Sequence, residues 1–226
     1  MTRFSIDLEE FLGNILKFRA LEIRRYLAFA MAVLLPVSLV FLSPTKANAA
    51  SENALSISNG FSHSCGTLVD GTVKCWGRNL TGQLGDGTKT DKSVPTVVAD
   101  LSGVSAIATG SFHTCALMSD TTVKCWGFNG SGQLGDGTTL SRTKATTVTG
   151  LDKAVAISVG ASHSCALLSD KTVKCWGSNS YGQLGVSGVS SSSTPVLVSG
   201  LTNVVSLSVG ANHNCVVLTD ATVKCW

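Results

Sequence analysis

The chain has 226 residues and a formal net charge of +3, with 44% hydrophobic and only 14% charged residues. Residues 1–49 hold six Lys and Arg against four Asp and Glu, so only +1 of this charge belongs to residues 50–226. No basic stripe remains that could follow a phosphate backbone, and we therefore expect no nucleic-acid partner.

Residues 1–49 are predicted to form a signal peptide. An apolar run over residues 27–42 follows Arg24-Arg25, and Ala47-Asn48-Ala49 has the small-x-small pattern of a cleavage site. Apolar side chains at helical spacing over residues 6–24 predict a helical leader. Cleavage after Ala49 would export the protein to the periplasm, the cell surface or the medium. The alternative is an uncleaved membrane anchor over 27–42, which would then be its one membrane contact.

From residue 54 the chain repeats every fifty residues without gaps, and every Cys, His and Trp belongs to the repeated unit. Such a period is typical of an array or a propeller. The predicted units are residues 54–103, 104–153 and 154–203, followed by a partial unit over 204–226.

Each unit is predicted to contain four short strands. The first alternates apolar and small residues, as over 104–108, and ends at a Gly such as Gly110, where a bend can use positive φ. The second and third form a hairpin, over 163–168 and 172–176 in the third unit. The fourth strands are expected at 95–99, 144–149 and 195–199, with Pro at the start of the first and last.

The hairpin turn varies between units. Gly71 of the first unit suits a left-handed backbone. Thr121, Lys171 and Ala221 replace it in the other units, so those turns are expected to be strained or differently shaped.

Four short strands per unit, Gly-marked turns and no amphipathic helix in the repeats predict an all-β fold. The favoured architecture is a β-propeller of four-stranded blades, with about 3.5 repeats present. A β-solenoid is the alternative, but its coils are usually shorter than fifty residues.

The recurring pattern is Gly-x-x-His-Ser-Cys-Ala-Leu-Leu-Ser-Asp-x-Thr-Val-Lys-Cys-Trp-Gly-x-Asn-x-x-Gly-Gln-Leu-Gly, as over residues 160–185. It resembles the repeat of the regulator of chromosome condensation (RCC1-like) family, in particular its secreted bacterial branch, over residues 54–226. The resemblance implies a seven-bladed propeller that serves as a protein-interaction platform. The founder of the family is an exchange factor for a small GTPase that also docks on chromatin, and the secreted branch includes inhibitors of extracellular enzymes. No position matches an exchange-factor catalytic residue.

The number of repeats departs from the family pattern. Three units and twenty-three further residues cannot close a seven-bladed ring, and Trp226 lies inside the most regular motif. We therefore expect a truncated seven-bladed propeller or an incomplete reading frame. An oligomer that completes its own ring is the alternative.

Eight cysteines in an exported chain favour disulfides. A three-residue turn centred on Asp170 places Cys165 opposite Cys175 on adjacent strands, within reach of an S–S bond. Free buried thiols are one alternative. A metal site is another, but His163 and the two cysteines supply three ligands where structural zinc needs four. The predicted pairs are Cys65–Cys75, Cys115–Cys125, Cys165–Cys175 and Cys215–Cys225.

Recurrence also bears on catalysis. A thiolate and its base form one singular site, whereas here His and Cys recur in every unit. We therefore interpret the histidines as core or turn residues, the tryptophans as packing between blades and the turn aspartates as structural. The chain is predicted not to be an enzyme, and no metal or cofactor is expected.

Binding specificity is expected where the units differ, in the loops after Trp-Gly and before His. Aromatic and Arg side chains often anchor interfaces. The expected function is that of an exported binding module with an unidentified protein partner on its loop face. The alternatives are a regulator of the exchange-factor type and the non-catalytic repeat region of a larger exported enzyme; ordinary surface variation is the alternative for each residue. The candidate partner-binding residues are Arg78, Phe112, Phe128 and Tyr181.

Overall fold

The computed structural model describes residues 53–226. The predicted signal peptide, its helix and the apolar run over 27–42 lie outside the described residues. The described part consists of strands, turns and loops, and none of its segments is a helix long and apolar enough to cross a membrane. The prediction of an all-β fold is therefore confirmed.

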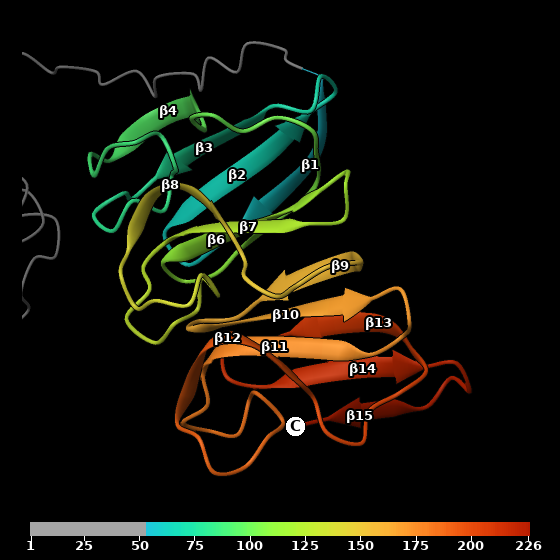
Figure 1. The fold of residues 1–226 in the computed structure, drawn as a ribbon. Helices are drawn as coiled ribbons and strands as arrows, with labels where there is room; N and C mark the ends of the chain where they lie inside the picture. The colour runs from blue at the N-terminus through green and yellow to red at the C-terminus, as the bar shows by residue number, and fades with distance from the viewer. Residues whose placement is uncertain (1–52) are drawn as a thin grey trace, which may run out of the picture. The chain divides into compact units, whose positions relative to one another are not determined.

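Fifteen strands gather in four antiparallel sheets (Figure 1), each with its strands in chain order. The strands are β1 (Ala54–Asn59), β2 (His63–Leu68), β3 (Val73–Gly77), β4 (Lys92–Val97), β5 (Val104–Thr109), β6 (His113–Met118), β7 (Val123–Gly127), β8 (Arg142–Thr147), β9 (Ala154–Val159), β10 (His163–Leu168), β11 (Val173–Ser178), β12 (Ser191–Leu197), β13 (Val204–Val209), β14 (Asn214–Leu218) and β15 (Val223–Cys225).

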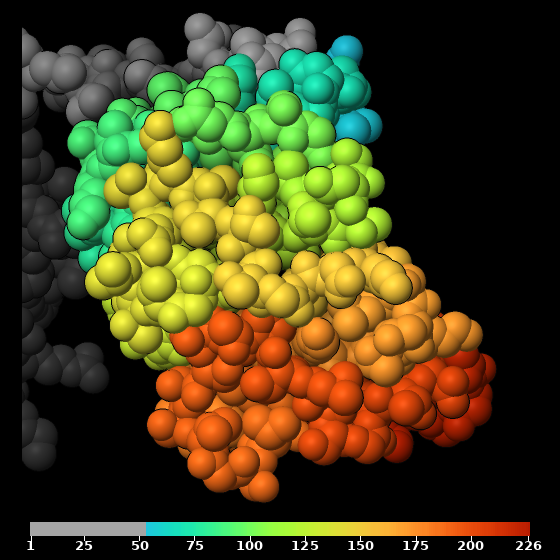
Figure 2. Space-filling view, viewed as in Figure 1, coloured from blue at the N-terminus to red at the C-terminus, as the bar shows by residue number. Residues whose placement is uncertain are grey.

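The sheets pack against one another in sequence, as the blades of a propeller do. The first strands of successive blades touch: β1 contacts β5, β5 contacts β9, and β9 contacts β13. Figure 2 shows the blades as consecutive bands of colour from cyan to red. We call the sheets blades 1 to 4 in chain order; blade 4 has three strands among the described residues.

The core lies between blades. Leu84 and Val98 of blade 1 pack with Ala116, Met118 and Trp126 of blade 2, and all five are buried. The same arrangement recurs between blades 2 and 3 and between blades 3 and 4. Because full burial of one large apolar side chain contributes about 1.5–3 kcal/mol, each blade depends on its neighbour for much of its stability. Packing of the tryptophans between blades is thus as expected.

The position of the fourth strands differs from the prediction. β4 begins at Lys92, three residues earlier than expected, and Pro95 lies within it rather than at its start. The ladder pairs Cys75 with Thr96 and Gly77 with Lys92, so two extra residues of β4 bulge between these pairs. Pro is tolerated there because an irregular edge strand needs no N–H at that point.

The variable hairpin turns keep one shape. Gly71 has φ of 77°, and Thr121, Lys171 and Ala221 have φ of 70°, 64° and 63°. The backbone is left-handed in all four, so the three non-glycine turns are strained rather than differently shaped.

Candidate functional site

The repeated His–Cys–Cys–Trp motif occupies the second and third strands of each blade. Cys165 and Cys175 are paired directly in the β10–β11 ladder, as the three-residue turn requires. The six cysteines of blades 1 to 3 have no exposed surface. The structure contains the four bonds that the spacing predicts: Cys65–Cys75, Cys115–Cys125, Cys165–Cys175 and Cys215–Cys225. Four disulfides are typical of a protein that folds in an oxidising compartment.

A chain of hydrogen bonds joins each blade to the next, and we call it the inter-blade relay. Between blades 2 and 3, His113 Nε2 lies 2.9 Å from Ser164 Oγ. Ser164 Oγ donates to the backbone carbonyl of Gln133 at 2.9 Å, and Trp176 Nε1 donates to the same carbonyl at 2.9 Å. The His and Gln belong to one blade, and the Ser and Trp to the following one. The relay therefore aligns two blades through polar groups that would be costly to bury unpaired.

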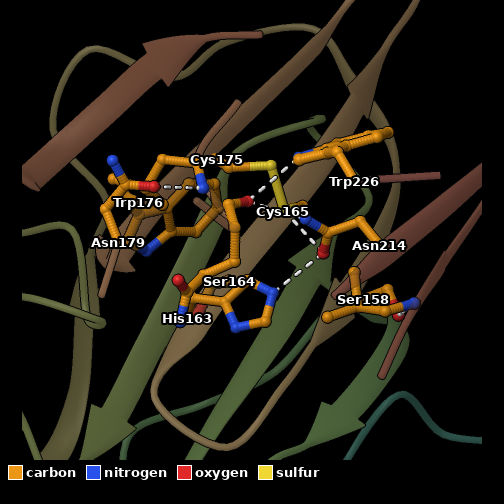
Figure 3. The surroundings of a disulfide bond; sticks show 12 residues. Ser158, His163, Ser164, Cys165, Cys175, Trp176, Asn179, Asn214 and Trp226 are labelled. Atoms are coloured by element: carbon orange, nitrogen blue, oxygen red, sulfur yellow. Dashed lines mark hydrogen bonds between the residues drawn. A yellow bond between two sulfur atoms is a disulfide. The ribbon is translucent and has the colours of Figure 1, made fainter. Parts of the chain in front are cut away.

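The relay recurs with substitutions. Figure 3 shows the version between blades 3 and 4, where His163 Nε2 lies 2.8 Å from Asn214 Oδ1. Asn214 Nδ2 and Trp226 Nε1 both donate to the carbonyl of Gln183, at 2.6 and 3.1 Å. Thr114 takes the same place between blades 1 and 2, at 2.8 Å from His63 Nε2.

These bonds fix the protonation of the histidines. The single hydroxyl hydrogen of Ser164 goes to Gln133, so Ser164 accepts from His113 Nε2–H. A second proton on Nδ1 would have no acceptor among the described residues. Burial accordingly lowers the pKa of His113 to about 3 and that of His63 to about 4. At neutral pH such a histidine is uncharged and its Nε2–H is hydrogen-bonded to the next blade. It therefore holds blades together and is a poor general base.

The glycines that precede the histidines have a different role from the expected one. None of them has positive φ. A Cβ on Gly60 would lie 2.2 Å from the carbonyl oxygen of Gly110, one on Gly110 2.4 Å from that of Gly160, and one on Gly160 2.6 Å from that of Gly210. The first three are therefore glycines because successive blades approach too closely for a side chain. A Cβ at any of the four would also meet the ring of the His three positions later, which at Gly210 is the nearest obstacle among the described residues. We call Gly60, Gly110, Gly160 and Gly210 the glycine belt. The prediction of a bend using positive φ was wrong.

The repeated residues thus form a scaffold. Each unit uses them for the same contacts with the next unit. Among residues 53–226, no group of three or more His, Cys, Asp or Glu side chains is placed to hold a metal ion. A site for a partner must be sought where the units differ.

The two ends of the blades differ in composition. One end carries the loops between first and second strands and between third and fourth strands, residues 60–62 and 78–91 in blade 1. The backbone N–H of Arg78 donates to the carbonyl of Ser62, which ties the two loops together. We call this the aromatic end, because its loops contain every Phe and Tyr of the described residues: Phe61, Phe112, Phe128 and Tyr181.

Three side chains form a cluster at the junction of blades 1 and 2. The rings of Phe61 and Phe112 meet edge to face, with centroids 6.2 Å apart. The guanidinium carbon of Arg78 lies 5.7 Å from the centroid of the Phe112 ring, within range of a cation–π contact. Phe112 is half-buried, whereas Phe61 is 79% exposed. The structure thus brings together two of the predicted residues, Arg78 and Phe112, with Phe61.

The side chains of the other two candidates take no part in these ring contacts. Phe128 follows β7 and is half-buried against its own loop, where its ring covers Gly130. Tyr181 is 74% exposed in the third–fourth strand loop of blade 3. That loop, residues 179–190, has no charged residue.

The loops that carry these side chains are rigid. In blade 3, Asn179 Oδ1 accepts from the N–H of Leu184, while Asn179 Nδ2 donates to the carbonyls of Val186 and Val189. Gln183 Oε1 accepts from the N–H of Tyr181. The recurring Asn and Gln therefore hold a loop whose remaining positions are free to vary.

Sequence reasoning missed several exposed apolar side chains on this end, Phe61, Leu80, Leu140 and Val189 among them. Phe61 and Leu140 are 79% and 64% exposed. A signal was present for Phe61, since Ser111, Ala161 and Ala211 occupy the equivalent positions. An isolated Phe among small residues is not needed by the repeat, which points to a surface role.

Comparison with known proteins agrees with the architecture. One sequence model of the regulator of chromosome condensation (RCC1) repeat matches residues 70–117, 122–167 and 172–217, more than half of the chain. A second model with the same description matches residues 55–83, 104–133 and 154–183. No curated protein sequence matches the chain.

Solved structures share the fold. The chain is similar to yeast RCC1 (Prp20), in a structure with Kap60 bound, with 24% identity and a TM-score of 0.68 over 78% of this chain and 44% of that one. It is also similar to human WBSCR16, with 22% identity and a TM-score of 0.70 over 78% of this chain and 48% of that one. The chain thus spans slightly less than half the length of these proteins. From the repeat matches and the propeller fold, the chain belongs to the regulator of chromosome condensation (RCC1) repeat family.

Proposed function

We propose that this chain is an exported protein-binding module that receives its partner on the aromatic end. The observation that carries the proposal is the segregation of every Phe and Tyr of residues 53–226 to the loops of that end. Exposing aromatic side chains to water costs free energy, which a partner that covers them removes, and such side chains are the usual anchors of protein interfaces.

The opposite end has another character. It carries the hairpin turns, such as residues 69–72, and the connections between blades, such as 98–103. In each turn an Asp accepts hydrogen bonds from the hydroxyl and N–H of the following Thr, as Asp70 does from Thr72 at 2.7 and 2.9 Å. These bonds hold the pKa of Asp70 below its usual range. The aspartates of the turns therefore have the same local role in every blade. We call this end, with its hairpin turns and connections between blades, the charged end, and it is less suited to an apolar partner than the aromatic end.

Relatives support a protein partner. Kap60 binds yeast RCC1 (Prp20), and Prp20p has binding properties toward Gsp1p and histones. At 24% identity this similarity extends to the fold, so the partners of Prp20p are not carried over to this chain. Export is supported by the four disulfides together with the predicted signal peptide.

The experiment compares two variants of the full, oxidised chain. The aromatic-end variant changes Phe61, Leu80, Leu140 and Tyr181 to Ser; the charged-end variant changes Val69, Val97, Val155 and Val205 to Ser. All eight residues are large, apolar and at least half exposed. Each protein is immobilised and incubated with the extracellular fraction of its own cells, and retained proteins are quantified by mass spectrometry.

A protein that is retained by the unchanged chain and the charged-end variant, and lost with the aromatic-end variant, supports the proposal. Retention that is equal on both variants contradicts it, as does loss from the charged-end variant alone. Failure of the unchanged chain to retain any protein counts against a binding role.

A further inference from the structure

Arg78 is an exposed cation without a carboxylate partner among the described residues. The nearby carboxylates are engaged elsewhere: Asp86 pairs with Lys92 at 3.4 Å, and Asp91 accepts from the N–H of Asn79 at 2.7 Å. The guanidinium lies over the ring of Phe112. The five N–H donors of the guanidinium are therefore available to a ligand.

Arg142, the first residue of β8, shows how a structural arginine is held beside the same kind of loop. Its Nε and one terminal nitrogen both contact Asp136 Oδ2, at 2.9 and 2.8 Å. That pair closes its own loop within one blade. Arg78 closes no loop, and at the equivalent positions of blades 2 and 3 the chain has Phe128 and Ser178. The fold therefore does not require a cation at this position.

The cluster is also preorganised. The N–H of Phe61 donates to the carbonyl of Gly110, and the carbonyl of Phe112 accepts from the N–H of Phe128 at 2.8 Å. Stacking on Phe112 further limits the freedom of the Arg78 side chain. A guanidinium held over an aromatic ring loses less entropy when it binds a carboxylate.

We propose that Arg78, Phe61 and Phe112 bind an acidic side chain of an extended partner segment, together with an apolar side chain two positions away. The proposal rests on the proposed function and names the chemistry of its partner. A carboxylate matches the planar fork of Arg78, and the exposed ring of Phe61 offers the adjoining apolar surface. Alternate side chains of an extended chain lie about 6.6 Å apart on one face, so the residue two positions from the carboxylate is its nearest neighbour on that face. The cluster extends in the same way, with Arg78 5.7 Å from the Phe112 ring and that ring 6.2 Å from the Phe61 ring.

The surroundings favour a single carboxylate over a polyanion. Asp86 and Asp91 belong to the same loop as Arg78, and Lys92 is already paired. Binding of nucleic acid requires several available cations along a groove. Residues 78–91 hold two cations, Arg78 and Lys89, against two carboxylates, so the loop has no net charge. One guanidinium over the Phe112 ring in such a loop suits one acidic side chain.

The test uses synthetic peptides immobilised at high density, with blocked termini so that the one carboxylate is a side chain. Their central residues are Glu-Ser-Phe, Gln-Ser-Phe or Glu-Ser-Ala in an otherwise identical Gly-Ser context. Binding of the full, oxidised chain is measured by biolayer interferometry. Arg78→Gln and Arg78→Lys are compared with Lys89→Gln, which removes the same charge from the same loop away from the rings.

We expect the unchanged chain to bind the Glu-Ser-Phe peptide about tenfold more tightly than the Gln-Ser-Phe peptide, as is typical of a charge-assisted hydrogen bond. Arg78→Gln should abolish this preference, Arg78→Lys should reduce it, and Lys89→Gln should retain it. Phe61→Ala should weaken binding of Glu-Ser-Phe toward that of Glu-Ser-Ala. Equal melting temperatures among the variants exclude a change in folding.

The proposal is overturned if the unchanged chain does not distinguish Glu from Gln, or if Arg78→Gln keeps the distinction. It is also overturned if a single-stranded DNA oligonucleotide displaces the peptide at equal concentration, which would assign the cluster to polyanions. If the chain shows no preference for Glu while the aromatic-end variant no longer retains the captured protein, the proposed function is supported and only the acidic partner segment is ruled out. If the aromatic-end variant retains the captured protein as well as the unchanged chain does, the proposed function is contradicted too.

Discussion

Two parts of this protein are built on opposite principles. The inter-blade relay recurs at the three junctions between described blades, and its central residues are buried: His113, Trp176 and Ser164 have no exposed surface. The glycine belt recurs in all four blades. The aromatic end has a different residue in each blade, and its largest side chains, such as Phe61 and Tyr181, lie mostly in solvent.

The difference separates stability from recognition. A contact that every blade makes must serve something that every blade needs, and that need is attachment to the next blade. A partner meets the assembly at one place, so the residues that distinguish it have no reason to recur. Changes in the repeated part should therefore alter the free energy of unfolding, whereas changes in the aromatic end should alter binding alone.

The largest effect is expected from reduction of the disulfides. Each bond closes a hairpin with a sequence separation of 10. In the chain-entropy model such a loop contributes about 2–3 kcal/mol, or about 10 kcal/mol for four. Urea unfolding with and without dithiothreitol measures the difference. The double variant Cys165→Ala and Cys175→Ala should lose about one quarter of this contribution to the free energy of unfolding. Identical transitions in both redox states would show that the bonds do not stabilise the scaffold.

A second effect is expected from acid. The pKa of His63 is about 4 in the folded protein against 6.5 when unfolded, so the unfolded chain binds more protons between these values. Stability is therefore complete above pH 6.5 and is lost as the pH falls toward 4, by about 3 kcal/mol for this residue. Burial lowers the pKa of His113 and of His163 as well, which adds to the loss.

Unfolding free energies between pH 7 and pH 4.5 test this, since the aspartates take up protons mainly below that range. His113→Gln should make the slope shallower at every pH in the window. A slope that is unchanged in this variant, or stability that rises on acidification, would contradict a buried neutral relay.

A third comparison uses two glycines with the same change. A Cβ on Gly110 would lie 2.4 Å from the carbonyl oxygen of Gly160, whereas one on Gly66 would lie 3.4 Å from that of Ser56. Gly110→Ala should destabilise by about 3 kcal/mol because two backbones must move apart. Gly66→Ala should be neutral or stabilising, since Ala116 and Ala166 occupy the same position in blades 2 and 3. Equal thermal stability of the two variants would refute the steric account.

The sequence predicted the scaffold well because the information is local or periodic. The three-residue turn sets the register that places Cys165 opposite Cys175, and the period of fifty residues sets the number of blades. The bulge in β4 was missed because it depends on pairing with β3, which the spacing of Pro95 does not reveal. The reason for the glycine belt was missed because the obstacle to a side chain lies in the next unit, about fifty residues away.

The cluster at the aromatic end could be found only in part. Its residues are singular, so Arg78 and Phe112 were recognised from the positions at which units differ. Their contact joins the loop after the third strand of one blade to the first loop of the next, and no local pattern encodes it. Which aromatic ring remains exposed depends on that packing, and Phe61 was therefore left out.

The smallest effect on stability is expected at this cluster, and it is the sharpest test of the separation between scaffold and binding face. Phe61→Ser removes a ring that is 79% exposed and introduces the residue found at the equivalent position, Ser111. We expect a change of at most about 0.5 kcal/mol in the free energy of unfolding, as for other exposed positions. His63→Ser, only two residues away but buried in the relay, is the matched variant and should cost at least about 2 kcal/mol. Urea unfolding of the two proteins side by side gives the answer. A large loss of stability in Phe61→Ser would mean that the ring supports the blade junction, and the aromatic end would then be part of the scaffold.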